Sequence, residues 1–291
     1  MTASPPLSLE NDPVEGPSTP IVNLSGYRFV ALDDLQALRS RLSQQLTASG
    51  VVGTLLLAEE GINVALAGSR SETDTARAVL DDDARFHALW LKESLSTIRP
   101  FAKLKVRIRQ EIIAFDGKKA LETAAARPAA PHLDPATLRR WLDDNRELTL
   151  LDTRNAYEVA SGSFTRATSL DMEHFRNFGE AVRAALDAGT LDRARPVVTF
   201  CTGGVRCEKA APWLLENGFQ EVWQIDGGVL NWFEQCGDAH WSGECFVFDD
   251  RVEIDPSLAP TGASLCTDCH RAVPRDTLCP CQSSRKAIDT V

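Results

Sequence analysis

The sequence has no apolar run that approaches the length of a membrane-spanning helix, so we expect no transmembrane segment. Its first residues also lack a basic stretch followed by an apolar stretch, the pattern of a secretory signal, so we expect a cytoplasmic location. Cysteine is absent before position 201, and all eight cysteines fall in the last third of the chain. This distribution excludes a secreted disulfide scaffold and points to catalysis or metal binding for some of these thiols.

Positive charge is scarcer than negative charge. The chain has 31 lysine and arginine residues and 41 aspartate and glutamate residues, which gives a formal net charge of −10. Such a surface argues against non-specific polyanion binding by the whole molecule, although a local basic patch is still allowed. A content of 43% hydrophobic and 25% charged residues is ordinary for a soluble globular protein, and 291 residues are enough for two domains.

The order of local patterns divides the chain into five segments. Residues 1–20 contain five prolines and no periodic apolar pattern, which predicts a disordered tail. We expect an N-terminal ferredoxin-like α+β domain over 21–119, an alanine- and proline-rich linker over 120–134, a parallel-sheet α/β domain over 135–240 and a short cysteine-rich C-terminal extension over 241–291.

The first domain shows the order strand, helix, strand, strand, helix, strand, which is the ferredoxin-like arrangement. Leucines at helical spacing predict a helix over 33–47 that ends at Gly50. A second helix is expected over 71–80, with Ser71 as its N-cap and Asp74 three residues further on.

The last predicted strand of this domain, residues 101–113, has one basic face and one apolar face. We call its four cations the basic quartet: Lys103, Lys105, Arg107 and Arg109. From 99 to 119 there are seven positive residues and two negative ones, a contrast typical of nucleic-acid contact. A solvated sheet face, on which lysine discourages aggregation, explains the pattern equally well. The aromatic pair of common RNA-binding sheets is not evident, so phosphate and shape contacts are expected.

The second domain contains a six-residue loop between a short buried strand, 197–200, and a helix, 208–217. The loop residues are Cys201, Thr202, Gly203, Gly204, Val205 and Arg206. The two glycines let backbone N–H groups turn inward, and together with a helix N-terminus and a guanidinium these groups should lower the pKa of the thiol. Cys201 is therefore the candidate nucleophile, and a buried cysteine beside a tight turn is the structural alternative.

Two residues at the end of the loop, Cys207 and Arg206, have two possible roles each. Cys207 is a candidate second redox thiol or a side chain that packs under the loop. Arg206 either holds the loop closed or binds an RNA phosphate. Asp152 and Arg154, at the carboxyl end of a neighbouring strand, are expected to form an ion pair that supports the loop.

Four cysteines of the extension have metal-ligand character: Cys266, Cys269, Cys279 and Cys281. Their spacing, with two, nine and one intervening residues, allows a tetrahedral zinc site, with His270 as a substitute ligand. The alternative is a metal-free tail, since the last pair is closer in sequence than in the usual knuckle.

Several motifs of the second domain resemble those of a rhodanese domain, in order and spacing. They lie at residues 151–154, 158, 162–167, 201–206 and 225–232. Related phosphatases of this fold use a loop one residue longer, so the six-residue loop is similar to the sulfur-type cradle.

A wider set of motifs resembles the rhodanese-containing tRNA uridine hydroxylases. These motifs lie at residues 60–63, 67–69, 92–94, 101–107, 151–159, 175–178, 201–210 and 241–252. The resemblance implies oxygen-dependent 5-hydroxylation of the wobble uridine of tRNA, dependent on Cys201. It implies tRNA as partner and dioxygen as co-substrate, with a reductant that the sequence does not identify. Pro212, inside the helix after the loop, departs from a regular helix and should perturb it.

Two other functions fit parts of the pattern. A rhodanese-type sulfurtransferase would carry a persulfide on Cys201, and a non-catalytic RNA-binding protein would retain the rhodanese module without using it. The mechanism that we expect is attack of the Cys201 thiolate on C6 of the uracil, which would activate C5 toward oxygen. The target base would have to leave its stack to reach the loop.

Overall fold

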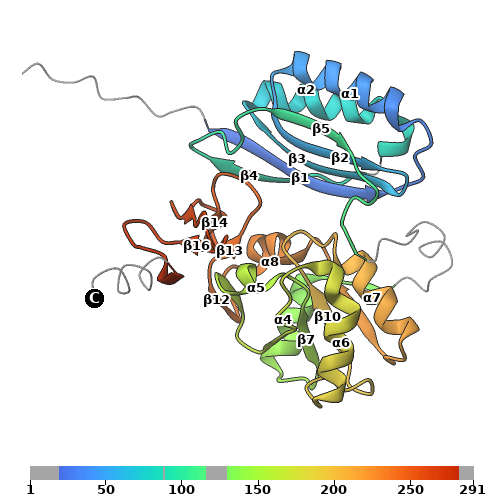
Figure 1. Cartoon of the computed structure of the whole chain (residues 1–291), viewed down its shortest axis with the longest axis vertical. Helices are drawn as coiled ribbons and strands as arrows, with labels where there is room; N and C mark the ends of the chain where they lie inside the picture. Colours follow the sequence, from blue (N-terminus) through green and yellow to red (C-terminus); the bar gives the residue numbers. More distant parts are fainter. Residues whose placement is uncertain (1–19, 88, 116–129, 282–291) are drawn as a thin grey trace, which may run out of the picture.

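The computed structural model of the chain describes residues 20–87, 89–115 and 130–281. Two α/β domains lie one above the other, and the C-terminal extension packs beside them (Figure 1). All but the last residue of the tail expected over 1–20, and most of the linker expected over 120–134, fall outside the described residues. Among the helices that the structure describes, none is long and apolar enough to cross a lipid bilayer.

The first domain is built on one mixed sheet with the strand order β4-β1-β3-β2-β5. Its elements are β1 (Ile21–Phe29), α1 (Leu35–Ser49), β2 (Val52–Ala58), β3 (Gly61–Gly68), α2 (Arg70–Asp81), η1 (Ala84–Phe86), β4 (Lys92–Ser96) and β5 (Leu104–Ile108). The order of β1 to β4 with α1 and α2 confirms the ferredoxin-like fold.

The sequence suggested that the basic strand is the fourth strand of this fold, but it is not. That place belongs to β4, which pairs antiparallel with β1, whereas β5 is an additional edge strand that pairs parallel with β2. The sequence did not predict the strand at 92–96, because these residues carry no clear alternation, so the basic strand took its place in the expected order. An edge position suits β5, since exposed lysine and arginine hinder pairing with another sheet.

Helices α1 and α2 cover the outer face of this sheet, away from the second domain (Figure 1). The predicted leucine stripe is buried there through Leu38, Leu42 and Leu46, and Gly50 ends α1 with a φ of 86°. The cap of α2 lies two residues earlier than expected, because Ser69, not Ser71, accepts the N–H of Glu72. The carboxylate of Glu72 in turn accepts the Ser69 N–H, which completes a capping box.

The second domain contains a five-stranded sheet with the order β6-β11-β10-β7-β9, and every pairing in it is parallel, as predicted. Its elements are β6 (His132–Leu133), α4 (Pro135–Asp143), β7 (Thr149–Asp152), α5 (Ala156–Val159), β8 (Gly162–Phe164), β9 (Ala167–Ser169), η2 (Phe175–Asn177), α6 (Phe178–Asp187), β10 (Val197–Phe200), α7 (Cys207–Glu216), β11 (Val222–Ile225) and α8 (Gly228–Cys236). Asp134 caps α4 with Pro135 at its first position, and α7 runs as one helix over Cys207–Glu216 although it contains Pro212.

Two apolar clusters cover the two faces of the second sheet. The extension adds β12 (Trp241–Gly243), β13 (Cys245–Phe246), β14 (Glu253–Ile254), β15 (Ser264–Leu265) and β16 (Ala272–Val273). Of these, β12 pairs with β8 and so joins the extension to the second domain. The strands β15 and β16 form a separate small hairpin.

Candidate active site

The six-residue loop joins the carboxyl end of β10 to the start of α7 and is shaped around the sulfur of Cys201. Gly204 has a φ of 95° and donates its N–H to Cys201 Sγ at 3.1 Å. The start of α8 closes the loop from the other side, since the N–H groups of Val229 and Leu230 bond the carbonyls of Cys201 and Thr202. A Cβ at Gly228 would lie 2.4 Å from the Cys201 carbonyl oxygen, so only glycine allows this close approach.

The surroundings of Cys201 favour its thiolate. Burial raises the pKa of this thiol, but a hydrogen bond from Cys207, the charge of Arg206 and the N–H groups of Arg206 and Gly204 lower it to about 6. The pKa of Cys207 is raised by burial and by its hydrogen bond to Cys201. The two sulfurs thus divide the roles, with Cys207 as a protonated donor and Cys201 as the anion that accepts.

Arg206 is held by Glu158 beneath the loop. Its two terminal nitrogens donate to the two carboxylate oxygens at 2.6 and 2.7 Å, and both side chains are buried. Glu158 is positioned by its own capping box, in which its carboxylate accepts the N–H of Asn155. Of the two roles considered for Arg206, this geometry matches the one that holds the loop closed.

Asp152 and Arg154 form a fully buried ion pair at the end of β7, with 2.6 Å between Arg154 Nη2 and Asp152 Oδ2. Ser163 donates to the same carboxylate, and Arg154 also donates to the Gly162 carbonyl. The pair therefore fixes β7 to β8 beside the loop.

A cavity of about 930 Å³ lies between the loop and the sheet face of the first domain that its helices leave open. Thr54, Leu56 and Asn63 line it from the sheet, and Cys201 and Arg206 line it from the loop. A volume of this size is within the range of about 300–1,000 Å³ typical of small-molecule sites. The nucleophile candidate thus faces a chamber that neither domain forms alone.

Four polar residues that the sequence did not single out lie in this chamber: Tyr27, His132, Glu208 and Asp226. Tyr27, from β1, donates to Glu208 Oε1 at 3.0 Å, and His132 Nε2 lies 3.4 Å from the same oxygen. The hydrogen bond to Glu208 and the charges of Glu208 and Asp226 raise the pKa of His132, although burial opposes this shift. Because the Tyr27 hydroxyl also lies above Gly204, the first domain contributes directly to the wall of the loop.

Lys209 is a second link between the domains. Its ammonium donates to Glu60 Oε1, Glu111 Oε1 and the Ile113 carbonyl, each at 2.9 Å, and it is 5% exposed. Glu60 and Lys209 belong to two of the sequence motifs described above, and their contact gives both motifs a common structural purpose. A buried ammonium with three acceptors is fully satisfied.

The basic quartet lies on and beside β5, and all four side chains are exposed. Lys105 is aligned with Thr54 and Arg107 with Leu56 in the parallel register of β5 and β2. Aligned residues of neighbouring strands point to the same face, so these two cations share the sheet face that lines the cavity.

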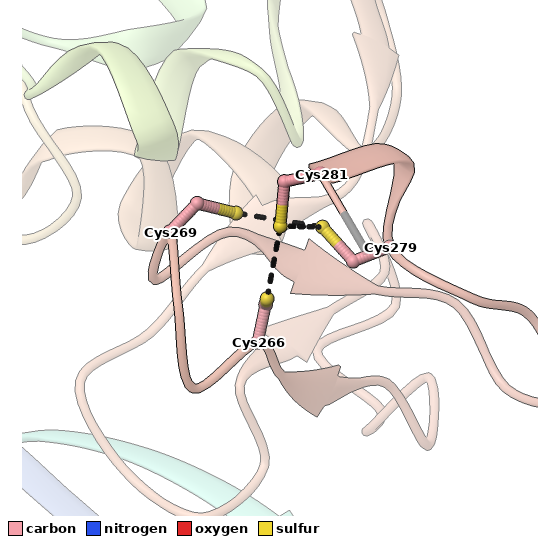
Figure 2. Close-up of side chains that lie close together, drawn as sticks. All are labelled: Cys266, Cys269, Cys279 and Cys281. Carbon is pink, nitrogen blue, oxygen red and sulfur yellow. Dashed lines mark hydrogen bonds between the residues drawn. The ribbon is translucent and has the colours of Figure 1, made fainter. Parts of the chain in front are cut away.

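The four cysteines of the extension lie together, with their sulfurs within 4.8 Å of one another (Figure 2). His270, considered as a substitute ligand, is not part of this group in the described residues. Cys236 and Cys245 are buried in the core of the second domain.

Comparison with known proteins covers both domains. The model of a UPF0176 acylphosphatase-like domain matches residues 21–112, and that of a rhodanese-like domain matches residues 134–235. A protein of Bordetella petrii is 47% identical over 248 residues, covering 84% of this chain and 96% of the relative. Proteins of Cupriavidus taiwanensis and Ralstonia nicotianae are each 45% identical, covering 87% of this chain and 89% of each relative. All three relatives are named tRNA uridine(34) hydroxylase.

Proposed function

The chain belongs to the tRNA uridine(34) hydroxylase family, and on this premise we propose that it hydroxylates C5 of the wobble uridine of tRNA with Cys201 as nucleophile. The observation that carries the proposal is a thiol with a lowered pKa on the wall of a two-domain chamber, one wall of which is a sheet face that Lys105 and Arg107 share. We infer domain limits of 21–119 and 135–240 for the two parts, joined by the linker, with β6 contributed from the end of that linker.

Cys201 starts the reaction as a thiolate. With a pKa of about 6, the thiolate outnumbers the thiol roughly tenfold at pH 7. Its sulfur adds to C6 of the uracil, and the electron pair of the C5–C6 bond moves toward C5 and the C4 carbonyl. C5 thereby becomes electron-rich and open to reaction with oxygen.

Dioxygen then supplies the hydroxyl oxygen. One oxygen atom forms a bond with C5, and the other leaves as water after uptake of two electrons from an external reductant. Loss of the proton on C5 and departure of the Cys201 thiolate from C6 restore the ring. Over the whole reaction, uridine, dioxygen, two electrons and two protons give 5-hydroxyuridine and water, and the thiolate is regenerated.

The chamber selects a base that has left its stack. Its volume of about 930 Å³ is large enough for an extruded nucleoside. We infer that Lys105 and Arg107, which share the sheet face that lines the chamber, contact phosphates next to the extruded base, and that Lys103 and Arg109 extend this contact along the strand. We also propose a cytoplasmic location, because tRNA is the substrate of this reaction.

The test is nucleoside mass analysis of tRNA from a strain that lacks this chain, complemented with wild type, Cys201→Ser or Cys236→Ser. Cys236 lies in the core away from the loop and serves as the matched thiol control. We expect 5-hydroxyuridine with wild type and Cys236→Ser and none with Cys201→Ser. Normal levels with Cys201→Ser would refute the proposal, and sulfane sulfur on Cys201 with turnover but no modified uridine would favour a sulfurtransferase.

A further inference from the structure

The hairpin of β15 and β16 brings together four thiols that the proposed reaction does not use. Cys266 follows β15, Cys269 lies in the turn, and Cys279 and Cys281 come from the segment after β16. All four sulfurs point toward a common centre (Figure 2). They are separate from the chamber, since none of them lines it.

The distances between the sulfurs match four cysteines that bind one metal ion and do not match disulfides. Three of the pairs lie at 3.3, 3.4 and 3.6 Å, and all lie within 4.8 Å. A disulfide would require a separation of about 2.05 Å. Four thiolates bound to zinc at about 2.3 Å lie at the corners of a tetrahedron with edges of about 3.8 Å. The observed separations bracket this value.

The hairpin has little else to hold it together. Its local cluster contains one apolar side chain besides cysteines, Val273, and each strand is two residues long. Leu265 and Leu278 are 45% and 62% exposed and contribute little burial. Segments of this kind are ordered by a metal or by disulfides, because their apolar burial cannot offset the conformational entropy of ordering.

We propose that Cys266, Cys269, Cys279 and Cys281 bind one structural zinc ion. Thiolate ligands favour zinc over magnesium, calcium and manganese. With four protein ligands the coordination is closed and leaves no position for substrate, so the ion folds the hairpin instead of taking part in the reaction. Iron is the competing metal for four thiolates, and the experiment distinguishes the two.

The hairpin in turn supports one wall of the chamber. Ala272 of β16 packs on a cluster of Phe246, Val252 and Ala263, which also contacts Tyr157. Phe248 lies 6.5 Å from the ring of Tyr157, and the Arg206 guanidinium is 5.8 Å from the ring of Phe248. Loss of the metal should therefore loosen Phe248 and raise KM for tRNA. This last consequence rests on the proposed function, whereas the metal content does not.

The experiment measures metal in the purified full-length chain, expressed with both zinc and iron in the medium. We expect one zinc per chain in wild type and in Cys236→Ser, and less than a tenth of that in the double variant Cys266→Ser, Cys269→Ser. Cobalt added to the metal-free wild type should produce the absorption of a tetrahedral thiolate site. This readout stands even if the double variant does not fold.

One iron per chain, no bound metal in wild type, or unchanged zinc in the double variant would overturn the zinc assignment. Failure of the hydroxylation test with one zinc still bound would overturn the proposed function and leave the zinc site intact.

Discussion

Replacement of Cys207 by alanine tests how the loop activates Cys201. Hydrogen bonding by Cys207 is among the causes that lower the pKa of Cys201, and the raised pKa of Cys207 keeps the proton on Cys207. A hydrogen bond to a charged group contributes about 1.5–3 kcal/mol, which corresponds to roughly 1–2 pKa units. The pKa of Cys201 should therefore rise from about 6 to roughly 7–8 in Cys207→Ala.

Whether Cys207→Ala slows or speeds the alkylation of Cys201 depends on pH. The thiolate is the reactive form, so the rate of alkylation rises as the pH passes upward through the pKa. At pH 6 half of Cys201 is thiolate in wild type, and roughly 1–10% would be in the variant, a rate loss of about 5- to 50-fold. At pH 9 both proteins are almost fully ionised, and the variant should react equally fast or faster, because thiolates of higher pKa are better nucleophiles.

The assay is iodoacetamide labelling of the full chain across pH 5–9, with mass analysis of the peptide that contains Cys201. Cys236→Ala is the control for the loss of a buried thiol from this domain. A midpoint that stays near 6 in Cys207→Ala would show that Cys207 does not donate to Cys201. A wild-type midpoint near that of a free thiol would refute the activated loop altogether.

Two further predictions concern the supports of the site. Glu158→Gln leaves the buried Arg206 without its counter-charge, and we expect a loss of about 3–5 kcal/mol in the free energy of unfolding by urea; a loss below about 1 kcal/mol, as for a surface pair, would contradict the buried role. Alanine at all four positions of the basic quartet should weaken tRNA binding and reduce the slope of log K against log salt by about 3–4. Arg139 and Arg140, exposed on α4, changed together to alanine are the matched control, and an equal effect there would remove the basic quartet from the proposed tRNA contact.

Both domain folds and the catalytic loop could be predicted from the sequence because their signals are local. The leucine stripe of α1, the short apolar run of β10 and the glycines of the loop each depend on neighbouring residues only. The site as a whole could not be predicted in this way. Tyr27 and Glu208 are 181 positions apart, and nothing near Tyr27 in the sequence marks it as a partner of the loop.

The wrong and missing predictions concern features that depend on contacts formed only in the folded chain. The basic strand was assigned to the wrong position because strand order within a sheet depends on distant pairing, here of β5 with β2 and of β4 with β1. The cap of α2 was misplaced because Ser69 and Ser71 are both good N-caps, and only the contact of Glu72 decides between them. Glu158 was noted as part of a motif, but its bond to Arg206 requires the folded loop.

The contact of Lys209 with Glu60 and Glu111 also limits how freely the two domains can be exchanged. A rhodanese domain from another protein could replace this one without a cation at position 209. The carboxylates of Glu60 and Glu111 would then lie close together in a buried interface between the domains. Their repulsion and lost solvation would push the halves apart and open the chamber to water. Chimeras of this scaffold should therefore be designed with Lys209 and its two acceptors transferred as a set.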